Sequence, residues 1–384
     1  MAFTGKATYS AGTTLPEQAE DVSDLVGIIS PYETPLLDAL GDPMREATST
    51  HHEWLEDDLL PNKDAINDST YSNPLTDTQF VVDNGSRFRV GDQIQVEGSE
   101  ELMLVTGIST NTLTVVRGYA GTTAESLADN QVINILGNAA LEGADKQAAR
   151  FTNRQRCGNY TQIFTATVEV SGSDMAASKL GLADEMDYQK QERLRELLRD
   201  LENTVLNSGQ PASNPEGSDA VRRTVKGILR HLSTNVFHTG DSGFPTGTSL
   251  DEDKINYVLR KIWESNSGNV DLIVVGGFQK RKINAFCADS RTFAAGDTKF
   301  TDMISIYESD FGVCRVVMTR WMPQDTALFL DSSRIGVLPL AGRSFHFKPL
   351  ASGGDYESGQ LIGEYTVELK NQAAHGAIKN LSTS

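Results

Sequence analysis

Apolar and polar residues alternate with a period of two between residues 75 and 136. Turn-forming residues interrupt this alternation at 97–99 and at 109–112. The alternating apolar pairs are Ile94 with Val96, Leu102 with Leu104, and Leu113 with Val115. Short alternating runs separated by polar turns are typical of antiparallel hairpins with one buried face. The segment is therefore predicted to form a small all-β module, either a barrel or a sandwich.

Two segments rich in strand-forming residues flank this module. They are residues 47–60 and residues 153–170, and the second contains the run Asn159-Tyr-Thr-Gln-Ile-Phe-Thr-Ala-Thr-Val-Glu-Val170. Two long strands that are separated by such an excursion indicate an extended β-hairpin. We expect the hairpin to carry the all-β module at its tip.

A period of three to four residues predicts a long helix over residues 184–207. Its apolar positions are Leu194, Leu197, Leu198, Leu201 and Val205. Charged residues occupy the other face, which is the pattern of an amphipathic helix packed on a core. The helix is long enough to act as a structural spine.

Residues 226–340 mix helical and strand patterns. Ser249 and Glu252 have the spacing of a capping box that would begin a helix. Strands are expected at 271–277, 313–318 and 326–330, with a basic helix over 279–286. This part of the chain is therefore predicted to be a mixed α/β domain.

The two ends of the chain have different patterns. Residues 1–45 are mostly polar, apart from a short helical candidate that begins at Pro16 and ends at Ser30-Pro31. Such a segment is typical of a flexible arm that becomes ordered on its partners. Strand patterns return in the tail, at 363–369 and 374–381.

Composition places the chain among globular proteins. Its 384 residues are 39% hydrophobic, which is enough for a core in two domains, or in one domain with a large insertion. The sequence has no apolar run long enough for a membrane span and no apolar block of a secretory signal, so assembly in a cytosol is expected. Cys157, Cys287 and Cys314 are widely spaced and fit neither a disulfide framework nor a zinc site.

The formal net charge is -18. Because phosphate contacts dominate the affinity of DNA-binding proteins, this charge argues against sequence-specific DNA recognition. It is compatible with a surface that faces DNA without adhering to it, and equally with a charge that only keeps an abundant protein soluble.

Four patterns in the sequence could indicate a site of chemistry, and none is complete. The loop Gly240-Asp-Ser-Gly243 resembles a protease nucleophile loop, but no histidine lies in the matching local sequence. His51 and His52 are adjacent on a predicted strand, so their side chains point to opposite faces and do not form a metal pair. The acidic runs 56–58 and 251–253 leave a glycosidase pair open, although charge runs are usually solvated. Phosphate-binding loops are absent. No catalytic, cofactor-binding or metal-binding residue is predicted, and the chain is not expected to be an enzyme.

Several collinear motifs resemble one family of tailed-bacteriophage major capsid proteins, the SU10 type. The motifs are Thr34-Pro-Leu-Leu-Asp-Ala-Leu-Gly41, Thr50-His-His-Glu-Trp54, Leu141-Glu-Gly143, Asn159-Tyr-Thr-Gln-Ile-Phe164 and Val170-Ser-Gly172. The resemblance is densest between residues 30 and 210. It implies an α+β chain with the HK97-like capsid fold and the following parts: an N-terminal arm, 1–45; an extended loop, 46–74 and 137–170; an inserted β-module, 75–136; a peripheral domain, 171–225 and 341–384; and an axial domain, 226–340.

The resemblance also implies a function and partners. The chain would assemble with itself into hexamers and pentamers of an icosahedral shell around double-stranded DNA, which it would touch non-specifically. It would be found in the virion after assembly in the host cytoplasm, with a portal protein as a partner; scaffold or decoration proteins stay open. The residues expected to contact neighbouring subunits are His51, Glu53, Trp54, Glu56, Asp57, Asp58, Arg150, Arg154 and Arg156.

Three alternatives remain at this point. The first is an encapsulin-like compartment shell, which shares the fold but holds enzymes. The second is a carbohydrate-active hydrolase with a β accessory module. The third is a tail or fibre protein, which would form an elongated trimer.

Overall fold

The computed structural model describes most of the chain after residue 32. The described residues are 33–42, 45–143, 145–147, 149–177, 184–265, 268–289, 306–351 and 353–383. The helix expected after Pro16 lies outside them. The chain divides into two compact units, one formed by Met1–Trp54 with Arg156–Ser384 and the other by Leu55–Gln155.

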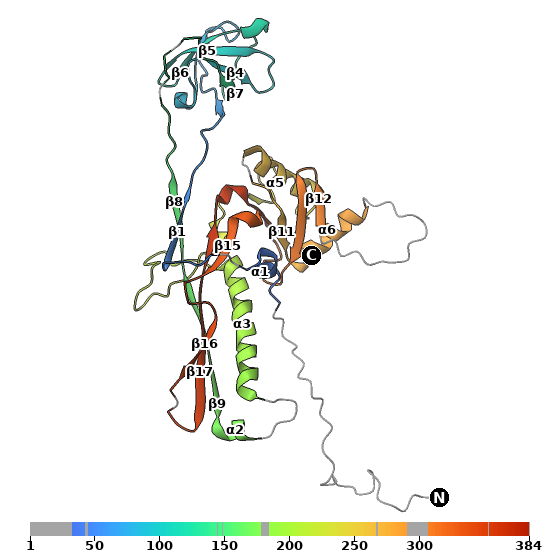
Figure 1. Ribbon diagram of the computed structural model, residues 1–384. Coiled ribbons are helices and arrows are strands. Elements are labelled where there is room, and N and C mark those ends of the chain that lie inside the picture. Colours follow the sequence, from blue (N-terminus) through green and yellow to red (C-terminus); the bar gives the residue numbers. More distant parts are fainter. Residues whose placement is uncertain are drawn as a thin grey trace, which may run out of the picture. The chain divides into compact units, whose positions relative to one another are not determined.

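The unit Leu55–Gln155 contains a six-stranded antiparallel sheet that closes into a barrel (Figure 1). Its strand order is β2-β7-β4-β5-β6-β3, and a bridge between Ile66 and Val82 joins the two outer strands. The strands are β2 (Lys63–Ala65), β3 (Gln79–Val81), β4 (Asp92–Val96), β5 (Leu102–Ser109), β6 (Thr112–Val116) and β7 (Val132–Asn138). Because β2 belongs to this sheet, the barrel begins before the predicted start at residue 75.

Strand β5 presents the opposite face to the one predicted. Met103 and Val105 point into the barrel core, whereas Leu102 and Leu104 are half-buried. The four residues are all apolar, so a period of two could not decide which pair faces inward. In β4 and β6 the predicted pairs are buried as expected.

Strands β1 (His51–Glu56) and β8 (Gln155–Tyr160) form a separate two-stranded sheet. The hairpin was expected to continue to residue 170, but β9 (Gln162–Ser171) pairs instead with β17 (Tyr356–Leu369) over ten residues. The break falls at Thr161, whose N–H bonds to the Thr50 carbonyl and whose hydroxyl bonds to Glu364. Residues 162–170, which were predicted to belong to the hairpin, are therefore part of the sheet that contains β17.

The predicted spine helix is confirmed as α3 (Glu185–Asn207), which lies along the sheet of β9 and β17 (Figure 1). Asp184 begins the helix by accepting hydrogen bonds from the N–H groups of Met186 and Asp187. Its buried stripe of Leu197, Leu201 and Val205 joins one core with strand residues such as Phe164 and Leu361. Strands β15 (Ile335–Pro339) and β16 (His346–Leu350) pair with the other edge of β17. Three short α-helices of the described residues complete this list: α1 (Pro35–Leu40), α2 (Gly172–Ala176) and α4 (Ile228–His231).

A six-stranded mixed sheet forms the α/β part in the order β10-β18-β14-β11-β13-β12. Its strands are β10 (Val236–His238), β11 (Leu272–Val275), β12 (Ile306–Ser309), β13 (Gly312–Met318), β14 (Ala327–Leu330) and β18 (Gly376–Lys379), and its helices are α5 (Glu252–Ser265) and α6 (Gly277–Asp289). All four residues of β11 are buried, because apolar clusters cover both faces of this sheet. Central strands with two buried faces read as continuous apolar runs, which is why 271–277 was recognisable.

Three local predictions need correction here. Asp251 rather than Ser249 begins α5, since its carboxylate accepts a hydrogen bond from the Lys254 N–H at 3.0 Å. The tail strand β18 pairs with β10 and β14, so it lies in this sheet and not with the peripheral strands. Conversely β15, which was expected in the axial part, pairs with β17.

Candidate functional site

The two adjacent histidines on β1 diverge, as their spacing predicts. The ring of His51 stacks on Tyr160, with centroids 4.3 Å apart. His52 hydrogen-bonds to the Glu368 carboxylate at 3.2 Å. Within the described residues, no group of three or more His, Cys, Asp or Glu residues could hold a metal ion. None of the helices in these same ranges is long and apolar enough to cross a membrane.

Trp54 is the apolar anchor of β1. Among the six residues of that strand it alone is buried. The centroid of its ring lies 5.9 Å from that of His52 and 6.4 Å from that of His231 on α4. Burial, with some help from Lys226, lowers the pKa of His231 to about 4, so this ring is neutral beside Trp54. Trp54 thus holds β1 within its own chain.

The charged residues expected at subunit contacts are brought together inside one chain. Glu53 and Arg156 lie 3.7 Å apart, and both are exposed. Asp57 lies 4.0 Å from Arg154 and accepts a 3.0 Å hydrogen bond from Thr152.

The remaining three predicted residues behave differently. Arg150 donates hydrogen bonds to the carbonyl oxygens of Ser86 and Phe88, at 2.6 and 2.8 Å, and so belongs to the barrel unit. Glu56 is half-buried, and Asp58 is exposed. The exposed ion pairs of Glu53 with Arg156 and of Asp57 with Arg154 contribute little to stability and can rearrange readily.

Sequence reasoning missed two buried carboxylates on β17. Glu368 is 2% exposed and pairs with Arg45 at 3.1 Å, Lys370 at 3.0 Å and His52. The hydrogen bond from His52, reinforced by Lys370 and Arg45, lowers the pKa of Glu368 to about 2 against the opposing effect of burial. The carboxylate is therefore ionised at neutral pH.

Glu364, four residues earlier on the same strand, is buried in the same way. It pairs with Arg223 at 2.6 Å and with Arg343 at 2.8 Å, and it accepts a 2.6 Å hydrogen bond from Thr161. A pattern in the sequence does indicate Glu364 and Glu368. Gly363-Glu-Tyr-Thr-Val-Glu-Leu369 places two acids in a strand that is otherwise buried, and buried acids in proteins are almost always paired.

Asn159 secures β8 beside these carboxylates. Its side-chain amide donates to the carbonyl oxygens of Lys226 and Val367, at 2.9 and 2.8 Å. Its side-chain oxygen accepts from Gln210 at 2.7 Å and from the Lys226 N–H at 2.9 Å. This fully buried side chain joins three segments through hydrogen bonds alone.

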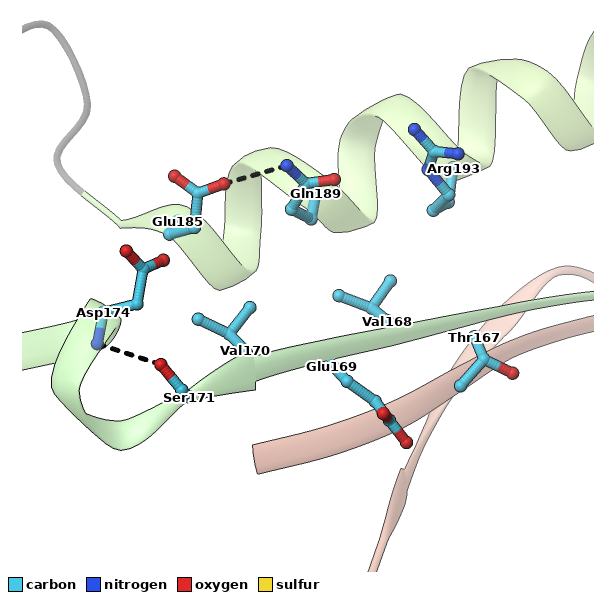
Figure 2. A pocket seen from close by; sticks show the side chains of 9 residues that line it. All are labelled: Thr167, Val168, Glu169, Val170, Ser171, Asp174, Glu185, Gln189 and Arg193. Atoms are coloured by element: carbon cyan, nitrogen blue, oxygen red, sulfur yellow. Dashed lines mark hydrogen bonds between the residues drawn. The ribbon is translucent and has the colours of Figure 1, made fainter. Parts of the chain in front are cut away.

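A groove of about 430 Å³ runs between α3 and β9 (Figure 2). Figure 2 shows Gln189 donating to Glu185 at one end, where Ser171 also accepts from the Asp174 N–H. Its lining is mostly polar and consists of Thr167, Val168, Glu169, Val170, Ser171, Asp174, Glu185, Gln189 and Arg193. The groove has the character of a solvated surface and not of a closed catalytic pocket.

A second hollow, of about 370 Å³, lies between α5 and the strand β13. Trp263 stands at its rim with 66% of its surface exposed, and its ring centroid lies 6.0 Å from that of Phe311. Large exposed aromatic side chains are enriched at protein interfaces.

A family model described as SU10 major capsid protein matches residues 4–382. No curated protein matches significantly.

The fold is similar to several solved capsids at low sequence identity. The capsid of a native GTA particle is 11% identical with a TM-score of 0.52, and the match covers 98% of this chain and 99% of that chain. The capsid of cyanophage A-1(L) is 9% identical with a TM-score of 0.52, covering 96% and 98%. The capsid of Myoviridae phage XM1 is 10% identical with a TM-score of 0.51, covering 96% and 99%.

Proposed function

The chain belongs to the SU10 major capsid protein family, and from this premise we propose that it assembles into hexamers and pentamers of an icosahedral head shell around double-stranded DNA. Its fold is the HK97-like phage capsid fold, which combines helices and sheets in an α+β arrangement. Its role is structural, with assembly in the host cytoplasm preceding its place in the virion shell.

Each part of the fold takes a role in this proposal. The sheet of β9 and β17 with α3 serves as the peripheral domain, and the mixed sheet with α5 and α6 serves as the axial domain. Residues 1–45 serve as the N-terminal arm. The paired strands β1 and β8, together with the segments that continue from them to the barrel, serve as the extended loop; we call this element the assembly arm.

The main observation in support of this function is the exposure of apolar side chains in the assembly arm. Leu59, Leu141 and Phe151 are 93%, 84% and 81% exposed. They lie in segments without regular secondary structure, where few neighbours in the same chain can cover them. Large apolar side chains at such exposure mark interaction surfaces, and the nearest partner of a subunit in a shell is another copy of the same chain.

The charged residues of the assembly arm would form the rim of this contact. Glu53 with Arg156 and Asp57 with Arg154 are exposed pairs that can exchange partners with a neighbouring copy at little cost. His51, Glu56, Asp58 and Arg150 would complete the polar rim. Trp54 supports the contact from beneath, since it is buried within its own chain.

The acidic charge fits the DNA cargo. A shell that is strongly negative repels packaged DNA, so the lining contacts it without sequence preference and without holding it. A portal protein is the further partner expected for a DNA-filled head, and scaffold or decoration proteins would act during or after assembly.

The proposal is tested by expressing the chain alone and imaging it by negative-stain electron microscopy. Closed shells, or sheets and rings of hexameric units, are expected. A monodisperse monomer at all concentrations and salt conditions, and also in the presence of its co-expressed phage assembly proteins, would contradict it.

Two variants locate the contact. Replacing Leu59 and Phe151 together with Ser is expected to abolish shells while leaving folded soluble subunits, because both side chains already face water in the free chain. The matched control is Val90→Ser in the barrel, which also removes an exposed apolar side chain and is expected to leave assembly unchanged. Equal assembly of both variants would move the contact away from the arm.

The family match over residues 4–382 disfavours the other readings. An encapsulin-like compartment would load enzymes instead of DNA, and a hydrolase with a β accessory module would remain a monomer that turns over a glycan. The same electron micrographs, with an assay for nucleic acid in shells purified from infected cells, separate these outcomes.

A further inference from the structure

Two buried carboxylates share one face of β17. Glu364 and Glu368 are four residues apart, and side chains at even spacing along a strand point to the same side. Both are nearly inaccessible to water. An ionised group in such a place requires partners, and here the partners come from other segments of the chain.

Each carboxylate binds at least one residue at or beside the base of the assembly arm, which we define as residues 50–54 and 156–161. The other partners, Arg223, Arg343 and Lys370, lie elsewhere in the chain. Glu368 receives Arg45 from the chain before β1 and His52 from β1 itself. Glu364 receives Thr161, the residue between β8 and β9, and Arg223. Both strands of the arm base are thus tied to β17 through charge.

Apolar packing supports the arm base at few positions. A two-stranded ribbon is marginally stable in water. In β1 only Trp54 is buried, and in β8 only Asn159 is buried, and the latter is held by hydrogen bonds. Apolar packing therefore supplies a small part of what fixes these strands. Hydrogen bonds supply the rest, some from the neutral Asn159 amide and others to the two carboxylates.

We propose that Glu368 is the positioning residue of the assembly arm, holding β1 in the place from which the arm engages the next copy. This inference rests on the proposed function of the arm as a subunit contact. Glu368 itself touches no neighbour. It acts through His52 and Arg45, and it fixes the base of the arm in the free subunit before any neighbour arrives, which lowers the ordering cost of assembly.

The ion pairs with Glu368 orient the arm base without requiring that the paired cations be buried. The cations that reach Glu368 remain partly in water, since the side chain of Arg45 is 61% exposed and that of Lys370 is 39% exposed. Only the carboxylate is fully desolvated. Loss of the carboxylate charge therefore releases all its partners together, whereas loss of one exposed partner releases one.

The test compares Glu368→Gln with Asp331→Asn in the full-length chain. Asp331 is a matched control, because it is also a buried carboxylate paired with an arginine. It differs in serving the loop after β14, where it also accepts the Asn269 N–H. Arg45→Met and His52→Gln are included as milder variants that keep Glu368, in case Glu368→Gln does not fold. The readouts are amide hydrogen exchange at residues 50–54 and 156–161, the melting temperature, and the rate of shell formation by light scattering.

Glu368→Gln is expected to speed exchange at the arm base about tenfold or more, with a smaller effect for Arg45→Met and none for Asp331→Asn. Shell formation is expected to slow in the same order, and more than the melting temperatures would explain. The proposal is overturned if exchange at the arm base is unchanged, if Asp331→Asn loosens it equally, or if the arm base loosens while shells form at the normal rate. Failure of the wild-type chain to form any shell overturns the proposed function instead, and the exchange data then report the anchoring alone.

Discussion

The ring of Phe347 lies directly over Gly359, so that a Cβ atom at position 359 would overlap it. Phe345 covers Gly363 in the same way on the same strand. The ammonium group of Lys190 on α3 sits 4.4 Å from the centre of the Phe347 ring. Two glycines in β17 thus leave room for the rings of Phe347, in the neighbouring strand β16, and of Phe345, just before that strand. The Phe347 ring also reaches the spine helix.

Gly359→Ala should therefore destabilise the peripheral sheet by roughly 1–3 kcal/mol, because the new methyl group displaces the ring in a packed site. Chemical unfolding in urea measures the loss. Gly209→Ala is the matched control, since nothing lies within 4 Å of its Cβ position, and it should be neutral or slightly stabilising. Equal losses in the two variants would mean that the ring does not need the space.

The barrel should depend on one buried ion pair. The Arg117 guanidinium donates to both oxygens of Glu101 at 2.8 Å and also to the Pro74 and Asp77 carbonyls. Arg117→Met leaves the Glu101 charge buried and unpaired, so we expect a cost of about 3–5 kcal/mol.

Proteolysis and hydrogen exchange of residues 63–138 should report this loss, while the peripheral and axial sheets stay protected. Arg89→Met serves as the control, because Arg89 is half-exposed and lies 3.8 Å from Asp92. It should change stability by no more than about 0.5 kcal/mol. A loss of protection in both units after Arg117→Met would show that they do not unfold independently.

His375 should make stability depend on pH. Its Nδ1 accepts the Asp331 N–H at 3.1 Å, and its Nε2 lies 3.3 Å from the Lys370 carbonyl, so the ring fits as the neutral form with the proton on Nε2. Burial lowers the pKa of His375 to about 4 from its usual 6.5. The stability that this group contributes is complete above pH 6.5 and is lost as the pH falls towards 4.

Urea unfolding of the wild-type chain between pH 7.5 and 4 measures this dependence. His375→Gln should flatten the part of the slope that belongs to His375, leaving the part due to His231, which titrates in the same range. An unchanged slope in the variant would show that His375 does not stay neutral in the fold. The pKa of Glu368 is also lowered, but its contribution is lost only below about pH 4.5, so the two effects are separable.

Glu202 of α3 should hold the short helix α1 in place. Its carboxylate accepts hydrogen bonds from the N–H groups of Leu36 and Leu37, at 3.1 and 3.4 Å, and from the Thr319 hydroxyl at 2.6 Å. Thr34, at the usual capping position, makes no side-chain cap. Glu202→Ala leaves these buried donors unsatisfied and should cost about 2–4 kcal/mol.

Limited proteolysis near residue 33 and the melting temperature check this prediction. Glu202→Gln keeps an acceptor oxygen and should lose less than half as much. Equal losses for Ala and Gln would assign the effect to charge rather than to the hydrogen bonds.

The sequence was most informative where one face of an element is buried. The stripe through Leu197 and Leu201 located α3 within one residue, because 3.6-residue periodicity has a unique face. Alternation located β4, β5 and β6 of the barrel, but it could not orient β5, where four consecutive residues are apolar. Local pattern therefore predicted the elements better than the side they present.

Pairing over long distances was beyond the sequence. Nothing local in residues 162–171 distinguishes a hairpin arm from a partner of β17. In the pairing of β9 with β17, Gln162 lies opposite Tyr365, which is 203 residues further along the chain. The same holds for Glu368, whose importance depends on His52 and Arg45 arriving from more than 300 residues away. The residues of the candidate contact were easier to name, because a strand with charges and one Trp stands out by composition alone.

The first and last strands of the barrel, β2 and β7, lie side by side, with Lys63 opposite Asn134. Entry and exit of the polypeptide are therefore neighbours, and the bridge between Ile66 and Val82 completes the wall without help from outside the unit. A domain with this geometry can be exchanged without changing the rest of the chain. Another domain whose termini are equally close could replace it by recombination or by design, so that each copy in a lattice would display a foreign payload at a fixed stoichiometry.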